Sequence, residues 1–425
     1  MLAAMFTPAR RSSPQATAVS RDRGDACPGT LRLHAADDGA LARVRLPGGV
    51  LTLRQAETLV DVAERLGDGY LHLTSRGNVQ VRGLEDGCAG ELAQLLDAAG
   101  LLPSRGHERV RNIVASPLSG LDGRGELDVR PWLTALDAAL CASEAAQALS
   151  GRFLFALDDG RGDVAGLGAD VTVRATADGG AELGLGTAGE ALRVSVEEAP
   201  RAALVAAETF LESTPEGRAW RVDELAMSAD DVLDAVDRHL TAEGIRHERQ
   251  LREGRCTDGP PPGAIGAGLS VHVALGRLSA HQWREMTHVA SEELRLTPWR
   301  GVVLPTHGQH SASLARLTAA GLVTDPHSPW LRVGACIGRP GCAKSHADVR
   351  ADADEALGAI GPSVLPLYWS GCERRCGHPR GDRVDVVATP GGGYRLSTAV
   401  SGQAPRTTSL DAPSRLATAL AAITP

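Results

Sequence analysis

The chain has 425 residues, a formal net charge of -8 at pH 7, and 43% hydrophobic but only 3% aromatic residues. This length allows two or three domains with substantial cores. The acidic balance argues against nucleic acid as the main partner, and no apolar run approaches the ~18 residues of a membrane span. Eight cysteines are too few for a disulfide scaffold, so we expect a cytoplasmic protein.

The first residues of the chain lack the basic-then-apolar order of a signal peptide, so residues 1–24 are expected to form a loose tail. Two later stretches, residues 25–105 and 254–330, read as copies of one another. Each contains an alternating strand, a glycine turn, an amphipathic helix, two short strands and a helix that stops at Ala-Ala-Gly-Leu. This order is close to a ferredoxin-like half. The sequence therefore predicts an α+β fold with two duplicated half-domains.

Each copy is followed by a different α+β segment. Residues 106–253 contain strand-like runs and a helical run, and a Gly- and Pro-rich linker begins at residue 254. Residues 331–425 form the second segment, which carries four cysteines in two pairs. We predict a site in the cleft that the duplicated halves share, because ligand sites commonly lie between domains.

The four cysteines are the clearest chemical signal in the chain. Cys336 and Cys342 form a Cys-x5-Cys pair, and after a 29-residue gap Cys372 and Cys376 form a Cys-x3-Cys pair. Thiolates are soft, charged ligands for metals and iron–sulfur clusters. Structural zinc sites usually leave about two to four residues between paired cysteines. The spacing therefore favours a 4Fe–4S cluster, while zinc or a disulfide pair stays open.

Beside these cysteines, the motifs RVRLPGG, LTSRGNVQVRG, RVRNIVASPLSG and LRLTPWR resemble the nitrite/sulfite reductase superfamily. The resemblance covers nearly the whole chain. It implies two ferredoxin-like halves that flank further α+β domains: residues 106–253 on the tetrapyrrole side, and residues 331–425 with a 4Fe–4S cluster on the four cysteines.

The same resemblance implies a set of binding residues. In siroheme reductases of the superfamily, arginines surround the substrate anion and the tetrapyrrole carboxylates. Carried over to this chain, that role falls to Arg43, Arg45, Arg76 and Arg111. Guanidinium groups suit the role because they bind carboxylates in bidentate fashion. Asn112, next to Arg111, is expected to hydrogen-bond the macrocycle or a strand edge.

The chain departs from those reductases in two places. Their second domain carries a Lys-x-Lys pair, whereas Lys344 is the single lysine here and lies just after Cys342. Arginine is a poor proton donor because its pKa exceeds about 12, which disfavours sulfite and nitrite as substrates. The reductases also have Pro-Asn within the last cysteine pair, where this chain has Glu-Arg-Arg.

The precorrin-3B synthase subgroup fits better. The chain resembles it in the segment that begins at Cys27, in FALDDGRGDVAGLGADV and in GCERRCGHP. The resemblance implies an oxygen-dependent monooxygenase of aerobic cobalamin biosynthesis, which hydroxylates precorrin-3A and closes a lactone with electrons from NADH. It also implies a mononuclear non-haem iron besides the cluster. A siroheme-dependent assimilatory sulfite or nitrite reductase is the alternative, and siroheme is a cofactor only there.

The sequence does not assign the ligands of such an iron. Non-haem oxygenase iron usually takes histidines and a carboxylate. His346 and Asp348 form one such pair, but a solvent-facing helix explains them equally well, and His378 could modulate the cluster or cap a turn. No GxGxxG follows a strand, so we expect electrons from NADH to arrive through a separate donor. Catalytic residues and oligomeric state stay open.

Overall fold

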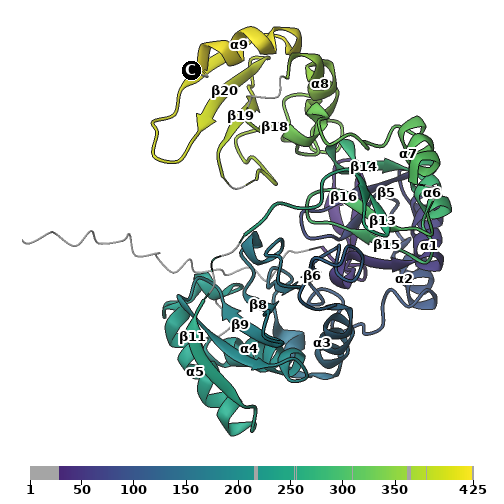
Figure 1. The fold of residues 1–425 in the computed structure, drawn as a ribbon. Coiled ribbons are helices and arrows are strands. Elements are labelled where there is room, and N and C mark those ends of the chain that lie inside the picture. The colour runs from purple at the N-terminus through teal and green to yellow at the C-terminus, as the bar shows by residue number, and fades with distance from the viewer. Residues whose placement is uncertain are drawn as a thin grey trace, which may run out of the picture.

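The computed structural model describes residues 28–214, 219–252, 254, 256–308, 310–360, 365–379 and 381–423. The expected tail at residues 1–24 and Cys27 lie outside the described residues. Figure 1 shows the two copies side by side, a middle domain (residues 113–251, teal) on one side of them and a cysteine domain (residues 333–423, green to yellow) on the other. Within the described residues, none of the helices has the length and apolarity that crossing a membrane requires.

The two copies have the same order of elements. The first contains β1 (His34–Ala36), β2 (Gly39–Val44), β3 (Val50–Thr52), α1 (Leu53–Leu66), β4 (Tyr70–Leu73), β5 (Val79–Leu84) and α2 (Ala89–Ala98). The second contains β12 (Gly263–Ile265), β13 (Gly268–His272), β14 (Arg277–Ser279), α6 (Ala280–Val289), β15 (Glu293–Leu296), β16 (Gly301–Pro305) and α7 (His310–Ala319). The predicted duplication is therefore confirmed.

The copies exchange one strand each. The first sheet has the order β1-β2-β5-β4-β14 and the second the order β12-β13-β16-β15-β3, so β3 and β14 each pair in the sheet of the other copy. Side chains from both copies consequently share one hydrophobic core, in which Leu51 of β3 and Leu278 of β14 are fully buried. Neither half can complete its sheet alone. The domain boundaries given above stay a prediction.

Local sequence explains why the exchanged strands end as they do. Thr52 and Ser279 each cap the helix that follows, and a glutamine three residues later (Gln55 or Gln282) closes a reciprocal capping box. Just before each exchanged strand the backbone turns through a left-handed residue, Gly48 in the first copy (φ 61°) and Leu275 in the second (φ 53°). The turn is thus kept even where no glycine relieves its strain.

The middle domain is a six-stranded sheet covered by helices. Its strands are β6 (Ile113–Ala115), β7 (Phe155–Asp158), β8 (Val171–Ala175), β9 (Gly180–Leu185), β10 (Glu190–Ser195) and β11 (His247–Leu251), in the order β11-β10-β9-β8-β7-β6. The helices α3 (Arg130–Ala142), α4 (Ala199–Glu212) and α5 (Ala229–Ala242) share a core with it. Because β6, β7 and β8 are parallel, the loops after them meet at one edge of the sheet.

The cysteine domain is a five-stranded mixed sheet. It contains β17 (Val333–Ala335), α8 (Val349–Glu355), β18 (Leu367–Ser370), β19 (Arg383–Ala388), β20 (Tyr394–Ala399), β21 (Thr407–Leu410) and α9 (Leu416–Ile423), with the strands in sequence order. Trp369 of β18 is fully buried and packs edge-on against Tyr394, with ring centroids 4.8 Å apart. The expected α+β fold is confirmed.

Candidate functional site

The two cysteine pairs meet because they follow neighbouring parallel strands. Cys336 comes directly after β17 and Cys372 shortly after β18, and the Cys336 amide donates to the Trp369 carbonyl oxygen (2.9 Å). The Gly371 amide donates to the Cys336 Sγ atom (3.2 Å). Since carboxyl ends of parallel strands share one edge of a sheet, both cysteine loops lie at that edge.

The surroundings of the thiols fit a bulky anionic cluster. Burial, and then the neighbouring Cys336, Cys372 and Cys342 thiols, raise the pKa of Cys376, so the four groups lie close enough to interact. Among the described residues, no three of these sulfur atoms lie within 4.8 Å of one another. A single tetrahedral zinc would hold its ligands closer than this, at about 2.3 Å from the metal. The donor set therefore suits a 4Fe–4S cluster, which would supply one-electron transfer.

One face of the first copy's sheet is polar. Along β5, Val79 and Val81 point into the hydrophobic core, and the side chains between them point to the opposite face. Cross-strand pairing places four polar residues in one row on that face, and these are Arg43 of β2, Gln80 of β5, His72 of β4 and Arg277 of β14. Asn78, which precedes β5, and Arg82, within β5, flank this row on either side of Gln80.

This polar face is partly buried, although polar faces of antiparallel sheets usually meet solvent. Asn78 is 1% exposed, His72 5% and Arg82 6%, whereas Arg43 and Gln80 are half-buried and Arg277 is exposed. The cysteine domain covers one end of it: Arg82 Nη2 donates to the Gly341 carbonyl oxygen (3.1 Å), and Arg350 Nη1 lies 3.4 Å from His72 Nδ1. A partly buried polar face next to the thiols is the strongest structural mark of a functional site.

The charge on this face is mainly positive. Burial, followed by the like charges of Arg277, Arg300 and Arg82, lowers the pKa of Arg350 to about 10. The Arg277 guanidinium lies over the Tyr70 ring, 3.5 Å from its centroid. Burial also raises the pKa of Tyr368 to about 12, and its hydroxyl donates to the Cys376 carbonyl oxygen (2.7 Å). The arrangement suits an anionic ligand.

The structure brings together three of the five predicted binding residues. Arg45 donates through Nη1 to Asn112 Oδ1 (2.9 Å) and through Nη2 to the Gly151 carbonyl oxygen (2.8 Å). Arg76 Nη1 reaches the same carbonyl at 3.4 Å. These contacts join the first copy to the middle domain beside β6 and β7. Asn78 also donates to Asn112 Oδ1 (3.3 Å), which links this group to the polar face.

The other two predicted residues lie elsewhere. Arg43 belongs to the row on the polar face, opposite Gln80. Arg111 makes a bidentate ion pair with Asp137 of α3, with both N–O distances at 2.7 Å. Its fork is therefore engaged within the middle domain, and a binding role for Arg111 stays a prediction.

The structure also shows where the residues considered as iron ligands lie. His346 is exposed, and Asp348 caps α8 by accepting from the Arg350 and Ala351 amides. His378 is exposed, and its Nδ1 lies 2.8 Å from the Arg375 carbonyl oxygen. These contacts give Asp348 and His378 a local structural use, and the iron ligands stay unassigned.

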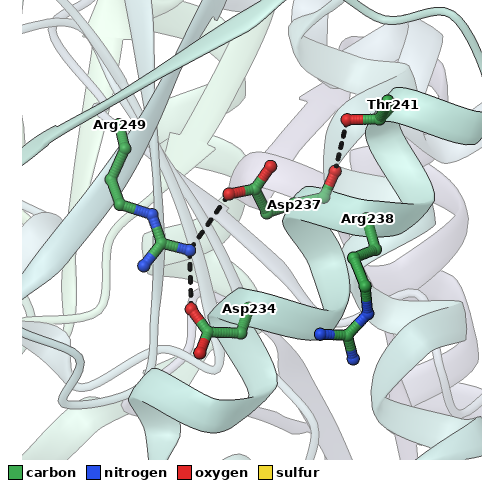
Figure 2. A pocket seen from close by; sticks show the side chains of 5 residues that line it. All are labelled: Asp234, Asp237, Arg238, Thr241 and Arg249. Carbon is green, nitrogen blue, oxygen red and sulfur yellow. Dashed lines mark hydrogen bonds and ion pairs between the residues drawn. The ribbon is translucent and has the colours of Figure 1, made fainter.

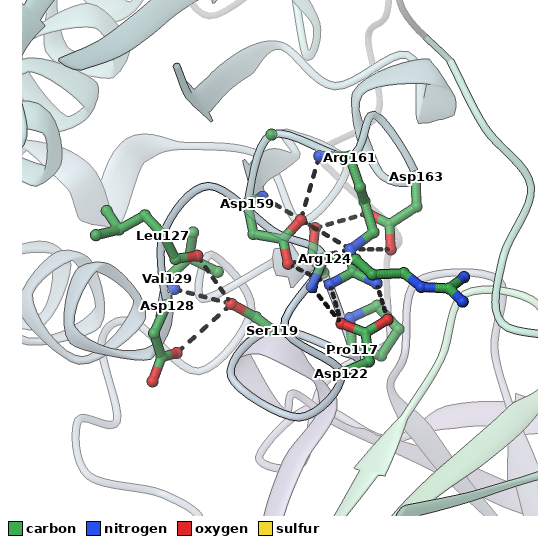
Figure 3. Close-up of polar contacts among 12 residues, drawn as sticks. Pro117, Ser119, Asp122, Arg124, Leu127, Asp128, Val129, Asp159, Arg161 and Asp163 are labelled. Atoms are coloured by element: carbon green, nitrogen blue, oxygen red, sulfur yellow. Dashed lines mark hydrogen bonds and ion pairs between the residues drawn. The ribbon is translucent and has the colours of Figure 1, made fainter. Parts of the chain in front are cut away.

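One acidic cluster occurs among the described residues: Asp158, Asp159 and Asp163 are buried and offer oxygen atoms within 4.8 Å of one another. Figure 3 shows Asp159 and Asp163 on either side of Arg161. Asp158 already accepts from four backbone amides, and Asp159 is paired with Arg161 at 2.7 Å. Asp163 accepts from Ser116 (2.6 Å), but its Oδ2 atom has no hydrogen bond. The three carboxylates therefore hold their own loop in place through hydrogen bonds and ion pairs. A single oxygen atom without a hydrogen bond provides too few ligands for a metal centre.

Two surface hollows lie in the middle domain. The first, of about 390 Å³, is formed by α5 and Arg249 of β11, whose guanidinium binds Asp234 (2.7 Å) and Asp237 (3.1 Å) (Figure 2). Its carboxylates are thus already neutralised. The second, of about 370 Å³, borders the loop at residues 165–168 and contains Arg174, Glu182 and Arg252. Neither hollow includes a cysteine of the two pairs.

Sequence reasoning missed His72, Arg82, Arg277 and Arg350. A signal for the first two was present, because LHL and VQVRG alternate apolar and polar residues as half-buried strands do. Alternation alone predicts a solvent-facing polar side. Only the packing of the cysteine domain shows that this side is partly buried.

Comparisons with known proteins agree with this fold. Residues 34–99 match the family described as the nitrite/sulfite reductase ferredoxin-like half domain. A precorrin-3B synthase from Sinorhizobium sp is 26% identical over 407 residues, which covers 91% of this chain and 85% of that protein. A ferredoxin–nitrite reductase from Synechococcus elongatus is 28% identical over 406 residues, covering 80% and 74%. The solved structure of the Mycobacterium tuberculosis NirA protein superposes with a TM-score of 0.67 at 19% identity, covering 89% of this chain and 79% of that one.

Proposed function

We propose that this chain, an oxidoreductase with the nitrite/sulfite reductase-like fold, is a precorrin-3B synthase of cobalamin biosynthesis. In that reaction a meso carbon of precorrin-3A is hydroxylated and a ring acetate closes a lactone. One atom of O2 enters the product. The other leaves as water, with two electrons and two protons from the reductant.

The observation that carries the proposal is the partly buried basic face that ends at the thiols. A tetrapyrrole with carboxylates on its rim needs several fixed cations, and charge-assisted bidentate pairs would set its orientation. Arg45, Arg76 and Asn112 lie near the start of β5, and Arg82 lies near its end beside the cysteine loop. Asn78 and Arg82 are separated by roughly 13 Å of extended chain. One ligand along this strand would contact both groups.

A cluster on Cys336, Cys342, Cys372 and Cys376 would supply single electrons at one end of this face. We assign Arg43, Arg45, Arg76 and Asn112 to substrate binding and leave Arg111 as a weaker candidate, since its fork binds Asp137. Exclusion of water by the surrounding domains would strengthen each ionic contact. The catalytic residues are not assigned.

The rival function is reduction of nitrite or sulfite with siroheme, which the similarity to the Synechococcus elongatus nitrite reductase favours. The proton supply argues against it. The only lysine, Lys344, is exposed. The buried cations of the polar face are arginines, which keep their protons at neutral pH.

Partners follow from the same reasoning. We propose O2 and a precorrin as substrates, with electrons from NADH delivered by a separate donor protein, in the cytoplasm. A mononuclear iron would complete oxygen activation, but the described residues provide no ligand set that we can name for it.

The test is a single-turnover assay under ¹⁸O2. Anaerobically purified protein is mixed with precorrin-3A and a chemical reductant, and the product is analysed by mass spectrometry. We expect one ¹⁸O atom in the product. Turnover of nitrite or sulfite by a protein with siroheme absorption bands, and no oxygen incorporation, would replace this proposal with the rival.

A further inference from the structure

Two guanidinium groups, one buried (Arg82) and one half-buried (Arg350), bind the main chain of the first cysteine pair. Arg82 Nη2 donates to the carbonyl oxygen of Gly341, the residue before Cys342 (3.1 Å). Arg350 Nε donates to the carbonyl oxygen of Cys336 itself (3.3 Å). Each of the two cysteines therefore has an arginine bound to a nearby main-chain carbonyl group, either its own (Cys336) or that of the preceding residue (Cys342). The proposed function places Arg82 at one end of the ligand-binding strand and gives Arg350 no role.

The first arginine belongs to a clamp between domains. Arg82 holds Asp38 of the β1–β2 turn in a bidentate pair (2.9 and 2.7 Å). The neighbouring Asp37 accepts from the Ala343 amide (2.5 Å). A side chain at Gly341 would come within 2.7 Å of Asp38 Oδ2, so the loop needs glycine to sit this close. The first copy thus holds the Cys342 loop from both sides.

The charge of this clamp is balanced, because one guanidinium faces one carboxylate. Arg350 differs. Among the described residues it makes no ion pair with a carboxylate, and its side-chain neighbour is His72 at 3.4 Å. Burial lowers the pKa of His72, so that ring is neutral at pH 7, and its Nδ1 accepts from Arg350 while Nε2 faces Asp68 at 3.6 Å. Arg350 therefore brings a net positive charge to the thiols.

We propose that Arg350 is a positioning residue that raises the reduction potential of the iron–sulfur cluster, and that the Asp38–Arg82 clamp holds the cluster loop without setting that potential. The inference rests on the cluster of the proposed function but not on the identity of its substrate. One-electron reduction adds a negative charge to the cluster. A nearby buried cation stabilises the reduced form more than the oxidised form. An ion pair with no net charge, such as Asp38–Arg82, changes the reduction potential much less.

The experiment is a redox titration of the cluster in the full-length holoprotein, monitored by electron paramagnetic resonance. Three variants separate charge from structure: Arg350→Gln, Arg350→Lys, and the double variant Asp38→Asn/Arg82→Gln, which leaves the net charge unchanged. Arg339→Gln is the matched control, because Arg339 lies in the same loop and binds the Ser345 carbonyl (2.8 Å) but is exposed to solvent.

We expect Arg350→Gln to lower the midpoint potential and Arg350→Lys to keep it near that of the wild-type protein. The double variant should leave the potential in place and make the junction near Gly341 more sensitive to proteolysis. Arg339→Gln should change neither property.

The inference fails if Arg350→Gln leaves the potential unchanged, or if the lysine variant falls as far as the glutamine variant. Wild-type protein without acid-labile sulfide would overturn both the inference and the cofactor of the proposed function. A cluster with normal titration in a protein that does not oxygenate precorrin-3A would overturn the proposed function alone.

Discussion

The two half-domains share a backbone but not a chemistry. β5 and β16 occupy the same place in their sheets, yet Gln80 and Arg82 of β5 correspond to Val303 and Pro305 of β16. The turns before β5 and β16 also share a residue with a left-handed backbone conformation, which is Gly77 (φ 65°) in the first copy and Arg300 (φ 58°) in the second. The two copies therefore keep the same strand topology. They differ in that β5 of the first copy presents polar side chains to the cysteine domain, whereas the equivalent positions of β16 do not.

The copies also dock crosswise. His72 of β4 contacts Arg350 of the cysteine domain, which follows the second copy in the chain. Arg295 of β15 occupies the equivalent position in the second copy. It donates to the carbonyl oxygens of Pro117 (3.0 Å) and Ser119 (2.7 Å) in the domain that follows the first copy. Each half thus also contacts the domain attached to the other.

The largest effect is expected where the copies touch backbone to backbone. Gly49 has φ +71°, and a Cβ atom there would overlap the Leu296 carbonyl oxygen of the second copy. Gly49→Ala should destabilise the protein by about 3–5 kcal/mol. Gly87→Ala is the control, since φ is +91° but nothing lies within 4 Å, and it should cost about 1–2 kcal/mol. Thermal unfolding of both variants would refute the exchanged-strand contact if they lost equal stability.

A smaller loss is expected where the second copy supports the middle domain. Arg295 is 2% exposed and pairs with Glu293 at 2.7 Å. Arg295→Leu removes the donor to two buried carbonyl oxygens and leaves that carboxylate unpaired, which should cost about 2–4 kcal/mol. Denaturant unfolding followed by tryptophan fluorescence measures it. A loss below about 1 kcal/mol would mean that the crosswise contact is not stabilising.

The next effect depends on pH and lies in the loop beside Ser116, next to Pro117. Burial, and then the charges of Asp158 and Asp159, raise the pKa of Asp163 to about 7. The folded state therefore binds more protons than the unfolded state between the ordinary pKa of 3.8 and about 7, so stability falls as pH rises through that window. The difference corresponds to at most about 4 kcal/mol.

Asp163→Asn should remove this pH dependence and stabilise the protein at pH 8 by about 1–2 kcal/mol, because the amide must still be desolvated. At pH 5 the gain should be smaller than at pH 8, because most of the window between 3.8 and about 7 lies above pH 5. Thermal unfolding at the two pH values measures both. A variant that is less stable than the wild-type protein at pH 8 would show that the ionised Asp163 carboxylate stabilises the folded state, so that its pKa is not raised.

The smallest effect is expected at the solvent-exposed contact between the copies. Arg284 of α6 pairs with Glu64 of α1 at 2.6 Å, and both side chains are largely exposed. Water and salt screen such a pair. Arg284→Ala should leave the unfolding temperature unchanged within error. A clear loss would indicate that surface pairs, and not the shared core, hold the copies together.

Much of the fold could be predicted from the sequence. The repeated order of strands and helices, the capping glutamines at Gln55 and Gln282, and the glycines around the thiols are local signals, and the structure confirms the α+β duplication. The strand exchange was not predicted. β3 and β14 are three residues each, and nothing within such short segments determines which sheet they join.

The site was predictable only in part. Spacing placed the cysteines, and motif likeness placed Arg45, Arg76 and Asn112, which the structure brings together at Gly151. Arg350 lies in a helix rich in charged residues, where it reads as an ordinary surface group. Its contact with Cys336 depends on how α8 packs beside β17, and its contact with His72 depends on how the cysteine domain meets the first copy. Neither is contained in a local sequence pattern.

The most direct test of the account is the acid-labile sulfide content of anaerobically reconstituted protein. The wild-type protein should hold about four sulfides per chain. Cys372→Ser should lose most of them, whereas Cys88→Ser, which changes a half-buried thiol of the first copy, should keep them. If Cys372→Ser retained the wild-type sulfide content, the four cysteines would not hold the cluster, and the account built on them would be wrong.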